Sequence, residues 1–192
     1  MAAGKSTVAA LFHKAGVPAF DADACVRRLQ GKGGKALPLI EQIFPGTVVE
    51  GRLDRGALRE IVRTQPDALK RLEAIMHPLV RAERARFLKQ CRARKEPFCV
   101  FDIPLLMEIG EDRRCDLVVV AEAPMSTRLS RIRQRGRSGA RMSMTDAKRL
   151  LKRQMSDHER RRRADIVIRT GLSRGHAARQ VHALLHRLRE AS

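Results

Sequence analysis

Two nearly continuous apolar runs constrain the fold of this chain more than any other feature. They span residues 98–103 and 115–121, and each has the length of one strand. Strands that are apolar at almost every position suit a parallel sheet that is covered on both faces. Helical patterns stand before and after both runs, and such strand–helix alternation predicts a three-layer α/β fold with a parallel sheet.

The rest of the chain continues this alternation. Short strands are predicted at 17–21 and 165–169, and Gly16 is expected to end the first helix, because glycine takes the left-handed cap conformation at little cost. Asp54 is expected to cap a helix. The predicted helices are 4–15, 24–30, 37–44, 54–62, one that starts near Pro66, 78–94, 124–135, 145–155 and 174–189.

The net charge of +19 raises the question of nucleic-acid binding. Platforms on which single-stranded bases stack are scarce, because the chain has no Trp or Tyr and its aromatic residues make up only 3%. Lysines and arginines are spread along most of the chain, and such charge also suits a pocket for phosphorylated ligands. We therefore expect adventitious binding of polyanions and no specific nucleic-acid partner.

The four cysteines favour an intracellular protein. Cys25, Cys91, Cys99 and Cys115 form no CxxC pair, so small buried thiols are favoured over metal ligands or disulfides. Cys91 stands between charged residues and is expected to be more exposed than the others. No signal peptide precedes the first motif and no apolar run approaches the roughly 18 residues that span a bilayer. The expected location is the cytoplasm, without membrane attachment.

The first motif with chemical content is GKST, the end of the phosphate-loop pattern GxxxxGK[ST]. In that pattern glycine lets backbone N–H groups close on phosphate oxygens at a helix N-terminus. Lys5 would reach the β- and γ-phosphates of ATP, and the Ser6 hydroxyl would ligate Mg²⁺. On these four residues alone, a helix start with a solvated lysine is an equal alternative. The predicted ATP-binding residues of the loop are Ala2, Ala3, Gly4, Lys5, Ser6 and Thr7.

The motif stands at the very beginning of the chain. The first glycine of the pattern and the strand before it would lie upstream of Met1. Two interpretations stay open at this point. Either the native protein begins roughly ten residues earlier, by a strand and half a loop, or the chain is a crippled copy.

Carboxylates follow two of the predicted strands. Asp21 and Asp23 come at the end of the second strand in the expected order, and Asp102 ends the run at 98–103. The carboxyl ends of parallel strands are where such sheets bind ligands. One carboxylate could accept the proton of an attacking hydroxyl. The alternative is that these residues only cap helices or end a strand.

Together these segments resemble the dephospho-coenzyme A kinase family over nearly the whole chain. The DAD, HP and PLLxE motifs in this order are far more specific than GKST. The matching segments are GKSTVAALF from Gly4, GVPAFDADACVRR from Gly16, IMHPLV from Ile75, FDIPLLME from Phe101, CDLVVVAEAP from Cys115, RLSRIRQR from Arg128, RQM from Arg153 and RRADIVIRTG from Arg162.

The resemblance implies transfer of the γ-phosphoryl group of ATP to the ribose 3′-hydroxyl of dephospho-CoA, the last step of coenzyme A biosynthesis. It implies Asp23 as general base, Lys5 as the second catalytic residue, and ATP with Mg²⁺ as cofactors. Arg131 and Arg135 resemble lid arginines that bind ATP, since phosphoryl transfer rests on positioning and charge neutralisation. The acceptor would meet Asp21, Arg27, His77 and Asp102.

By the same resemblance the chain is one P-loop kinase domain, 1–192, with an acceptor-side helical insertion at about 31–95 and a helical lid at about 128–163. A non-catalytic, polyanion-binding relic of this fold and a kinase for another nucleotide or nucleoside remain the alternatives. The family has Asp-Asn or Asp-Thr after the last strand, near the adenine, whereas this chain has Arg169-Thr170. The motifs leave the oligomeric state open.

Three further features are expected to have no catalytic role. His77 precedes Pro78, and this pair is interpreted as the start of a helix, where the histidine would be a cap or a wall of the acceptor site. The residues from Arg160 to Arg163 are expected to form a solvated helix end. His182 and His186 lie four residues apart on the last helix, and without a third ligand nearby they do not predict a metal site.

Overall fold

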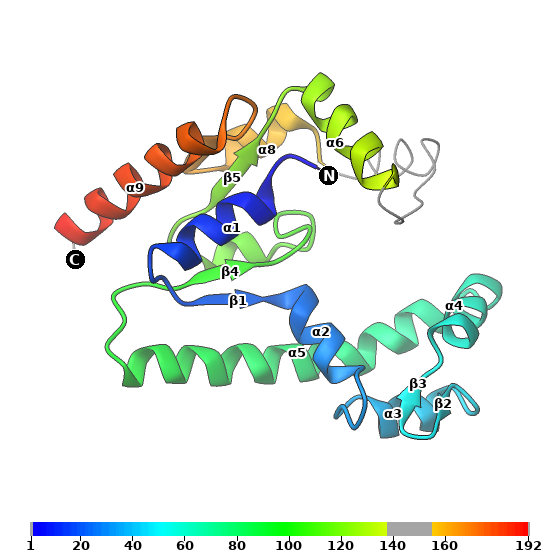
Figure 1. Ribbon diagram of the computed structural model, residues 1–192. Coiled ribbons are helices and arrows are strands. Elements are labelled where there is room, and N and C mark those ends of the chain that lie inside the picture. The colour runs from blue at the N-terminus through cyan, green and yellow to red at the C-terminus, as the bar shows by residue number, and fades with distance from the viewer. Residues whose placement is uncertain (1, 138–154, 192) are drawn as a thin grey trace. The chain divides into compact units, whose positions relative to one another are not determined.

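The computed structural model describes residues 2–137 and 155–191, and for 135–137 the backbone alone (Figure 1). The predicted helix at 145–155 therefore lies almost entirely outside the described residues. The chain forms two compact units. We call Met1–Ala19 with Pro104–Ser192 the split unit and Phe20–Ile103 the continuous unit. The prediction of a single domain with an insertion and a lid stays a prediction.

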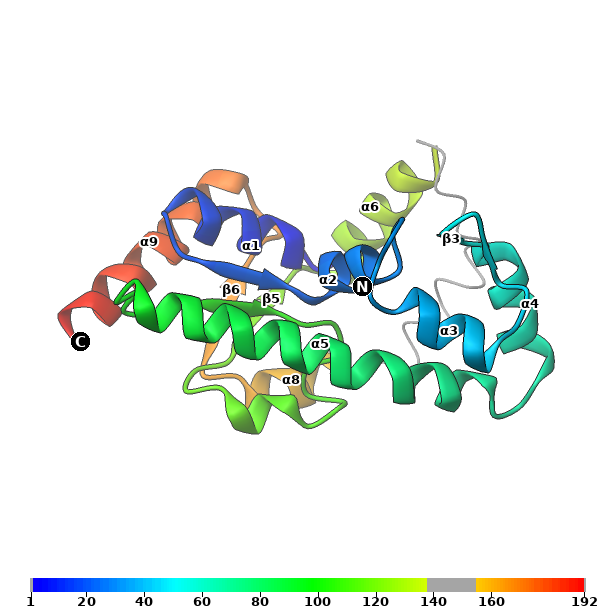
Figure 2. The same ribbon diagram turned by 90° about the horizontal axis from the view of Figure 1, so that it is seen from below.

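In the split unit two helices pack on a short parallel sheet. Strands β5 (Val119–Glu122) and β6 (Ile166–Arg169) pair in parallel over four residues. Helix α1 (Lys5–Lys14) contacts β5, helix α9 (Arg174–Glu190) contacts β6, and the two helices contact each other. Figures 1 and 2 both show α1 beside α9. The predicted parallel sheet is confirmed for these two strands.

The described residues of this unit also form a 3-10 helix, Glu111–Arg114, and helices α6, Met125–Arg137, and α8, Asp157–Arg163. The strand predicted at 115–121 begins only at Val119. Cys115 instead closes the 3-10 helix, because its backbone N–H donates to the Asp112 carbonyl at 3.1 Å. An apolar run thus fixed the strand itself but not its first residue.

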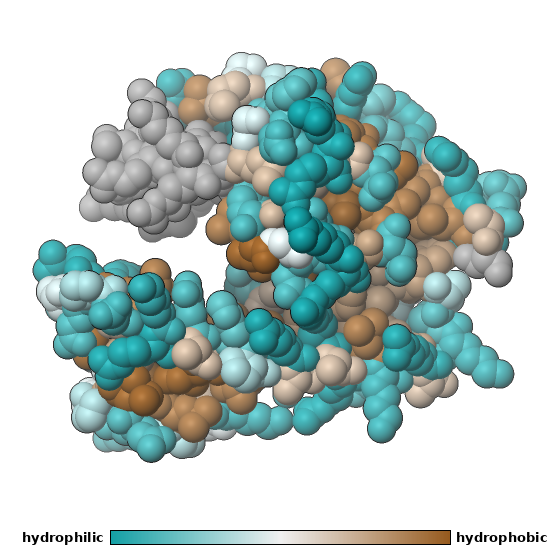
Figure 3. Space-filling model, turned by 180° about the vertical axis from the view of Figure 1, so that it is seen from behind, coloured by the Kyte–Doolittle hydropathy of each residue, from teal (hydrophilic) through white to brown (hydrophobic). Residues whose placement is uncertain are grey.

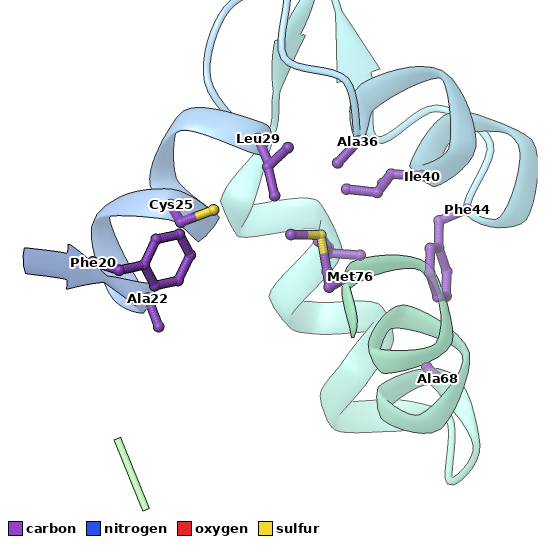
Figure 4. Close-up of a cluster of buried hydrophobic side chains, with 10 residues drawn as sticks. Phe20, Ala22, Cys25, Leu29, Ala36, Ile40, Phe44, Ala68 and Met76 are labelled. Carbon is purple, nitrogen blue, oxygen red and sulfur yellow. The ribbon is translucent and has the colours of Figure 1, made fainter. Parts of the chain in front are cut away.

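The continuous unit is built around one long helix, α5 (Ala68–Ala93). Helices α2 (Ala22–Leu29), α3 (Leu37–Ile43) and α4 (Arg55–Thr64) all pack against it. Its core includes Phe20, Leu29, Ile40 and Phe44, buried members of the hydrophobic cluster that Figure 4 shows. The other elements are β1, Ala19–Asp21; β2, Val48–Val49; β3, Arg52–Leu53; and β4, Val100–Asp102.

The prediction that a helix starts at His77-Pro78 is wrong. Helix α5 is continuous through Pro78, so His77 lies in its middle and is exposed. A proline inside a helix costs about 3 kcal/mol locally. Burial of Ala68 and Met76 on one side of Pro78 and of Cys91 on the other holds the helix in one piece.

A hairpin was also missed between the third and fourth helices. Strands β2 and β3 pair antiparallel, with Val48 opposite Leu53. Glu50 and Gly51, the two residues between the strands, have φ of 49° and 69°. A two-residue hairpin turn of type I′ requires positive φ at both central residues. Glycine at the second of these positions was the local sign of this turn in the sequence.

The burial of the cysteines departs from expectation. Cys91, expected to be the more exposed, is buried because it lies on the inner side of α5, whereas Cys99 and Cys115 are only half-buried. Cys25 is fully buried, and this burial raises the pKa of its thiol despite the opposing charge of Arg28. The four cysteines all lie within the described residues, and no disulfide joins any of them.

The outer surface is mainly hydrophilic on the face that Figure 3 shows. Exposed large apolar side chains, such as Leu172 and Ile109, also occur, which is ordinary for a folded domain. Within the described residues, none of the helices combines the length and the apolar character needed to cross a bilayer.

Candidate active site

The phosphate loop leads into α1 through a glycine that no other residue replaces easily. Gly4 is the N-cap of α1 and has φ 94°, in the left-handed region where glycine is favoured. Its carbonyl accepts hydrogen bonds from the N–H groups of Thr7 and Val8, at 2.9 and 3.0 Å. Lys5 and Ser6 are exposed in the first turn, as an anion site at a helix N-terminus requires.

Thr170 holds this loop from the far end of the sequence. It follows β6, is buried, and its hydroxyl donates to the Ala3 carbonyl at 2.6 Å. A Cβ on Gly4 would lie 2.5 Å from the Thr170 hydroxyl oxygen. The close approach is therefore a second reason for glycine at this position. In the sequence, Thr170 stood out only as part of Arg169-Thr170, the pair that departs from the family pattern.

Arg131, on α6, joins the same group. Its guanidinium donates to the carbonyls of Ala2 and Thr170, at 3.2 and 2.6 Å, and to the Thr170 hydroxyl at 3.3 Å. The sequence prediction that Arg131 belongs to the nucleotide side agrees with this placement next to the loop, although its contact with ATP stays a prediction. The side chain of Arg135, predicted for the same role, lies outside the described residues.

A pocket of about 380 Å³ opens beside the loop. Every residue that lines it belongs to the split unit. Its walls come from the loop, from α6 and from the start of α9, and they combine apolar, hydroxyl and basic side chains. Six of these wall residues are Gly4, Thr7, Arg131, Gln134, Leu172 and Arg174.

In the continuous unit, the structure gives Asp21 and Asp23 different tasks. Asp21 is the N-cap of α2, and its carboxylate accepts the Ala24 N–H at 2.8 Å. The Arg27 guanidinium lies 3.8 Å from the same carboxylate. Asp23 stands in the first turn of α2 and is exposed, and its carboxylate makes no hydrogen bond or ion pair with another described residue. Capping, the alternative for both residues, applies to Asp21.

Asp102 ends a strand that neighbours the strand of Asp21. Strands β1 and β4 are hydrogen-bonded neighbours. The residues just before the two aspartates, Phe20 and Phe101, pack with ring centroids 6.2 Å apart. Asp102 is half-buried there. His77, by contrast, is on α5, and its imidazole makes no hydrogen bond or ion pair within the described part of the chain.

Comparison with known proteins agrees with these features. A family model described as dephospho-CoA kinase matches residues 1–174. The chain belongs to the dephospho-CoA kinase family. It is similar to the dephospho-CoA kinase of Gluconobacter oxydans (strain 621H), with 83% identity over the whole chain and 96% of the relative. That of Mesorhizobium japonicum is 47% identical, with 97% and 91% covered. The predicted family and its kinase activity are confirmed.

Solved structures support the fold. The crystal structure of TT1252 from Thermus thermophilus superposes with a TM-score of 0.76 at 34% identity and covers all of this chain and 94% of its own. Dephospho-CoA kinase from Campylobacter jejuni gives a TM-score of 0.72 at 25% identity, with 100% and 94% covered. The predicted α/β fold of a P-loop kinase is confirmed.

In this kinase, the solvated helix end predicted at Arg160 to Arg163 holds only in part: Arg161 and Arg162 are exposed, but Arg160 and Arg163 are half-buried. Arg160 pairs with Asp157, and Arg163 pairs with Asp112 and donates to the Met107 carbonyl at 3.3 Å. Arg128 is buried and donates to both Asp157 oxygens, at 3.1 and 3.0 Å. The pairs Arg163–Asp112 and Arg128–Asp157 join residues 51 and 29 positions apart, so no local pattern indicated them.

These pairs set the charge state of two acids. Burial alone would raise the pKa of Asp157, but hydrogen bonds and charge from Arg160 and Arg128 hold it below the ordinary value. The hydrogen bond from Arg163 likewise lowers the pKa of Asp112. Both carboxylates are therefore ionised at neutral pH, and α8 is anchored at both of its ends.

The residues that could hold Mg²⁺ are few. The exposed Ser6 hydroxyl stands in the first turn of α1. The described residues contain no group of three or more His, Cys, Asp or Glu side chains that could hold a metal ion. Mg²⁺ in nucleotide sites is held mainly by phosphate oxygens and needs only one or two protein oxygens, so this donor set fits it.

Proposed function

We propose that this kinase transfers the γ-phosphoryl group of ATP to the ribose 3′-hydroxyl of dephospho-CoA, giving CoA and ADP as the last step of coenzyme A biosynthesis. The observation that carries the mechanism is the division of work between two aspartates. Asp21 accepts the N-cap hydrogen bond of α2, so the exposed carboxylate of Asp23 is available as a base. Family membership supplies the acceptor.

On the nucleotide side, the N-terminus of α1 and the loop residues 2–7 bind the phosphates. Lys5 neutralises charge on the β- and γ-phosphates. Ser6 would hold Mg²⁺, which would shield the same phosphates when bound. We assign the nucleoside of ATP to the neighbouring pocket, whose walls offer the apolar Leu172 together with the hydroxyl of Thr7.

On the acceptor side, Asp23 accepts the proton of the 3′-hydroxyl as its oxygen attacks the γ-phosphorus. The bond from that phosphorus to the bridging oxygen breaks, and ADP leaves with the electron pair. The exposed side chains of Arg27 and His77 can donate hydrogen bonds to the phosphates of the acceptor. The Asp102 carboxylate can accept hydrogen bonds from the ribose hydroxyls of the acceptor. Arg131 and Arg135 would stabilise charge on the nucleotide phosphates.

We also propose that the enzyme works in the cytoplasm. Four cysteines that form no disulfide suit a reducing compartment, where ATP is also available. Specific nucleic-acid binding is not part of this proposal. The net charge of +19 also suits an enzyme that binds two phosphorylated substrates.

A coupled ADP-release assay with several acceptors tests the function. Dephospho-CoA should be turned over, and the product should support a CoA-requiring acetyltransferase. Adenosine, other nucleosides and AMP should give far lower kcat/KM. Equal turnover of a nucleoside would favour the kinase for another acceptor, and a product inactive in the acetyltransferase assay would move the phosphorylated hydroxyl elsewhere.

A further inference from the structure

We infer that Thr170 is a positioning residue which, together with Arg131, fixes the direction of the phosphate-binding N–H groups before ATP arrives. The inference rests on the proposed ATP site and adds a residue to it. Thr170 need not touch the phosphates for this. It acts through the loop backbone, and its position 167 residues away from Ala3 in the sequence hides that role.

The hydroxyl of Thr170 has one proton and two nearby acceptors. It lies 2.6 Å from the Ala3 carbonyl and 3.1 Å from the Glu122 carbonyl. The shorter contact is the stronger one, so the proton goes to Ala3. Its lone pairs remain for Arg131, whose Nη1 donates from 3.3 Å.

The backbone of Thr170 is itself held firmly. Its N–H donates to the Glu122 carbonyl at 2.7 Å, which continues the β5–β6 pairing by one residue. Its carbonyl accepts Nη2 of Arg131 at 2.6 Å. The side chain is buried, with the residue only 4% exposed. A hydroxyl fixed on the sheet can therefore act as a rigid anchor for a loop.

The geometry of the peptide unit turns this anchor into a functional device. In a planar trans peptide, the C=O and the following N–H point in opposite directions. Because Thr170 holds the Ala3 carbonyl, the Gly4 N–H must point away from Thr170. Because Arg131 holds the Ala2 carbonyl at 3.2 Å, the Ala3 N–H must likewise point away from the Arg131 guanidinium.

Two consecutive loop N–H groups are thus aimed by two side chains. Consecutive N–H groups of fixed direction form a concave anion site, and fixing them in advance removes part of the entropy cost of binding. Gly4 also packs directly against Thr170, as the 2.5 Å approach of its would-be Cβ shows. Packing and hydrogen bonding therefore fix one and the same loop conformation.

The test is the substitution Thr170→Val, which keeps the shape of the side chain and removes the hydroxyl. We expect the Kd for ATP and for ADP, measured by calorimetry, to rise about tenfold. The Kd for adenosine, which has no phosphate, should stay within about twofold. An equal rise for ATP and adenosine would mean a contact with the base or a general loss of structure, and would overturn the inference. An unchanged ATP affinity would overturn it as well.

Two variants serve as controls. Thr170→Ser keeps the hydroxyl and should restore ATP affinity to within about threefold of the parent. Thr47→Val removes another buried hydroxyl, one that donates to the Phe44 carbonyl at 2.7 Å in the continuous unit. It should lower the melting temperature about as much as Thr170→Val does, with no change in ATP affinity.

If Thr170→Val does not fold, Thr170→Cys replaces it, because a thiol has a similar size and is a much weaker donor. Its ATP affinity should then be lower than that of Thr170→Ser, and equal affinities would count against the inference. Lys5→Ala separates this idea from the proposed site. If Lys5→Ala loses ATP binding but Thr170→Val retains it, only the role of Thr170 is wrong. If Lys5→Ala retains ATP binding, the assigned ATP site is wrong.

Discussion

In the split unit the phosphate loop is held by side chains from distant parts of the sequence, whereas in the continuous unit the two aspartates are placed by the strand and helix that carry them. Thr170 and Arg131 hold the carbonyls of Ala3 and Ala2. Asp21, by contrast, makes its defining contact with Ala24, only three residues away. One site depends on tertiary contacts, the other on local capping.

The difference has a physical origin. An anion site made of backbone N–H groups needs a fixed loop conformation, and a loop of small residues cannot fix itself because it has few side-chain contacts of its own. A carboxylate in the first turn of a capped helix is positioned by that helix. We therefore expect substitutions to act over long distances in the split unit and locally in the continuous unit.

The largest effect is expected for Lys5→Ala. Without the ammonium group, charge on the β- and γ-phosphates is no longer neutralised, and turnover should fall at least a thousandfold, on the order of what removing a charge-stabilising group from phosphoryl transfer costs. The melting temperature should not change, because Lys5 is exposed. Lys14→Ala, at the exposed end of the same helix, is the control and should be fully active. Normal turnover of a folded Lys5→Ala protein would remove the central premise of the site.

Asp23→Asn comes next and tests the local logic of the continuous unit. The amide keeps the shape but cannot accept the proton, so kcat should fall by about 10² to 10⁴ while ATP affinity stays nearly constant. Steady-state kinetics at saturating ATP measure this. Asp54→Asn makes the same chemical change at an N-cap, where Asn substitutes well, and should leave kcat unchanged. A kcat for Asp23→Asn within about threefold of the parent would contradict its role as base.

A stability effect is expected from Arg128→Met in the split unit. The substitution removes a buried guanidinium and leaves the Asp157 carboxylate with one partner fewer. Since Asp157 is itself 43% exposed, the cost should be about 2 kcal/mol, below that of breaking a fully buried pair. Urea unfolding measures it, and Arg133→Met on the exposed side of α6 should cost little. Equal stability of the two variants would mean that the Arg128 pair contributes nothing.

The smallest effect concerns pH. Because the pKa of Asp157 is lowered in the folded protein, its ionised form adds stability above the unfolded pKa of about 4. That contribution is lost as pH falls through the lower, folded pKa. The stability difference between the parent and Asp157→Asn should therefore be constant from pH 5 to 8, roughly 1 kcal/mol or less, and should shrink below about pH 4. A difference that grew toward acid pH would contradict this sign.

The sequence determined the features that depend on neighbours a few residues apart. The apolar runs gave the strands, Asp54 capped its predicted helix by accepting the N–H groups of Gly56 and Ala57, and Gly16 took the left-handed conformation with φ 80°. GKST marked the start of α1. These outcomes follow from backbone sterics and local hydrogen bonds, which hold in almost any surroundings.

Only the tertiary structure decided the rest. Packing on both sides of Pro78 kept α5 in one piece and buried Cys91, against the local preferences of proline and of a charged neighbourhood. Asp157 pairs with Arg128 and Asp112 with Arg163, and Thr170 became the anchor of a loop at the opposite end of the chain. These contacts join residues 29 to 167 positions apart. Their free energy exists only once the core has brought those residues together, so no local pattern in the sequence predicts them.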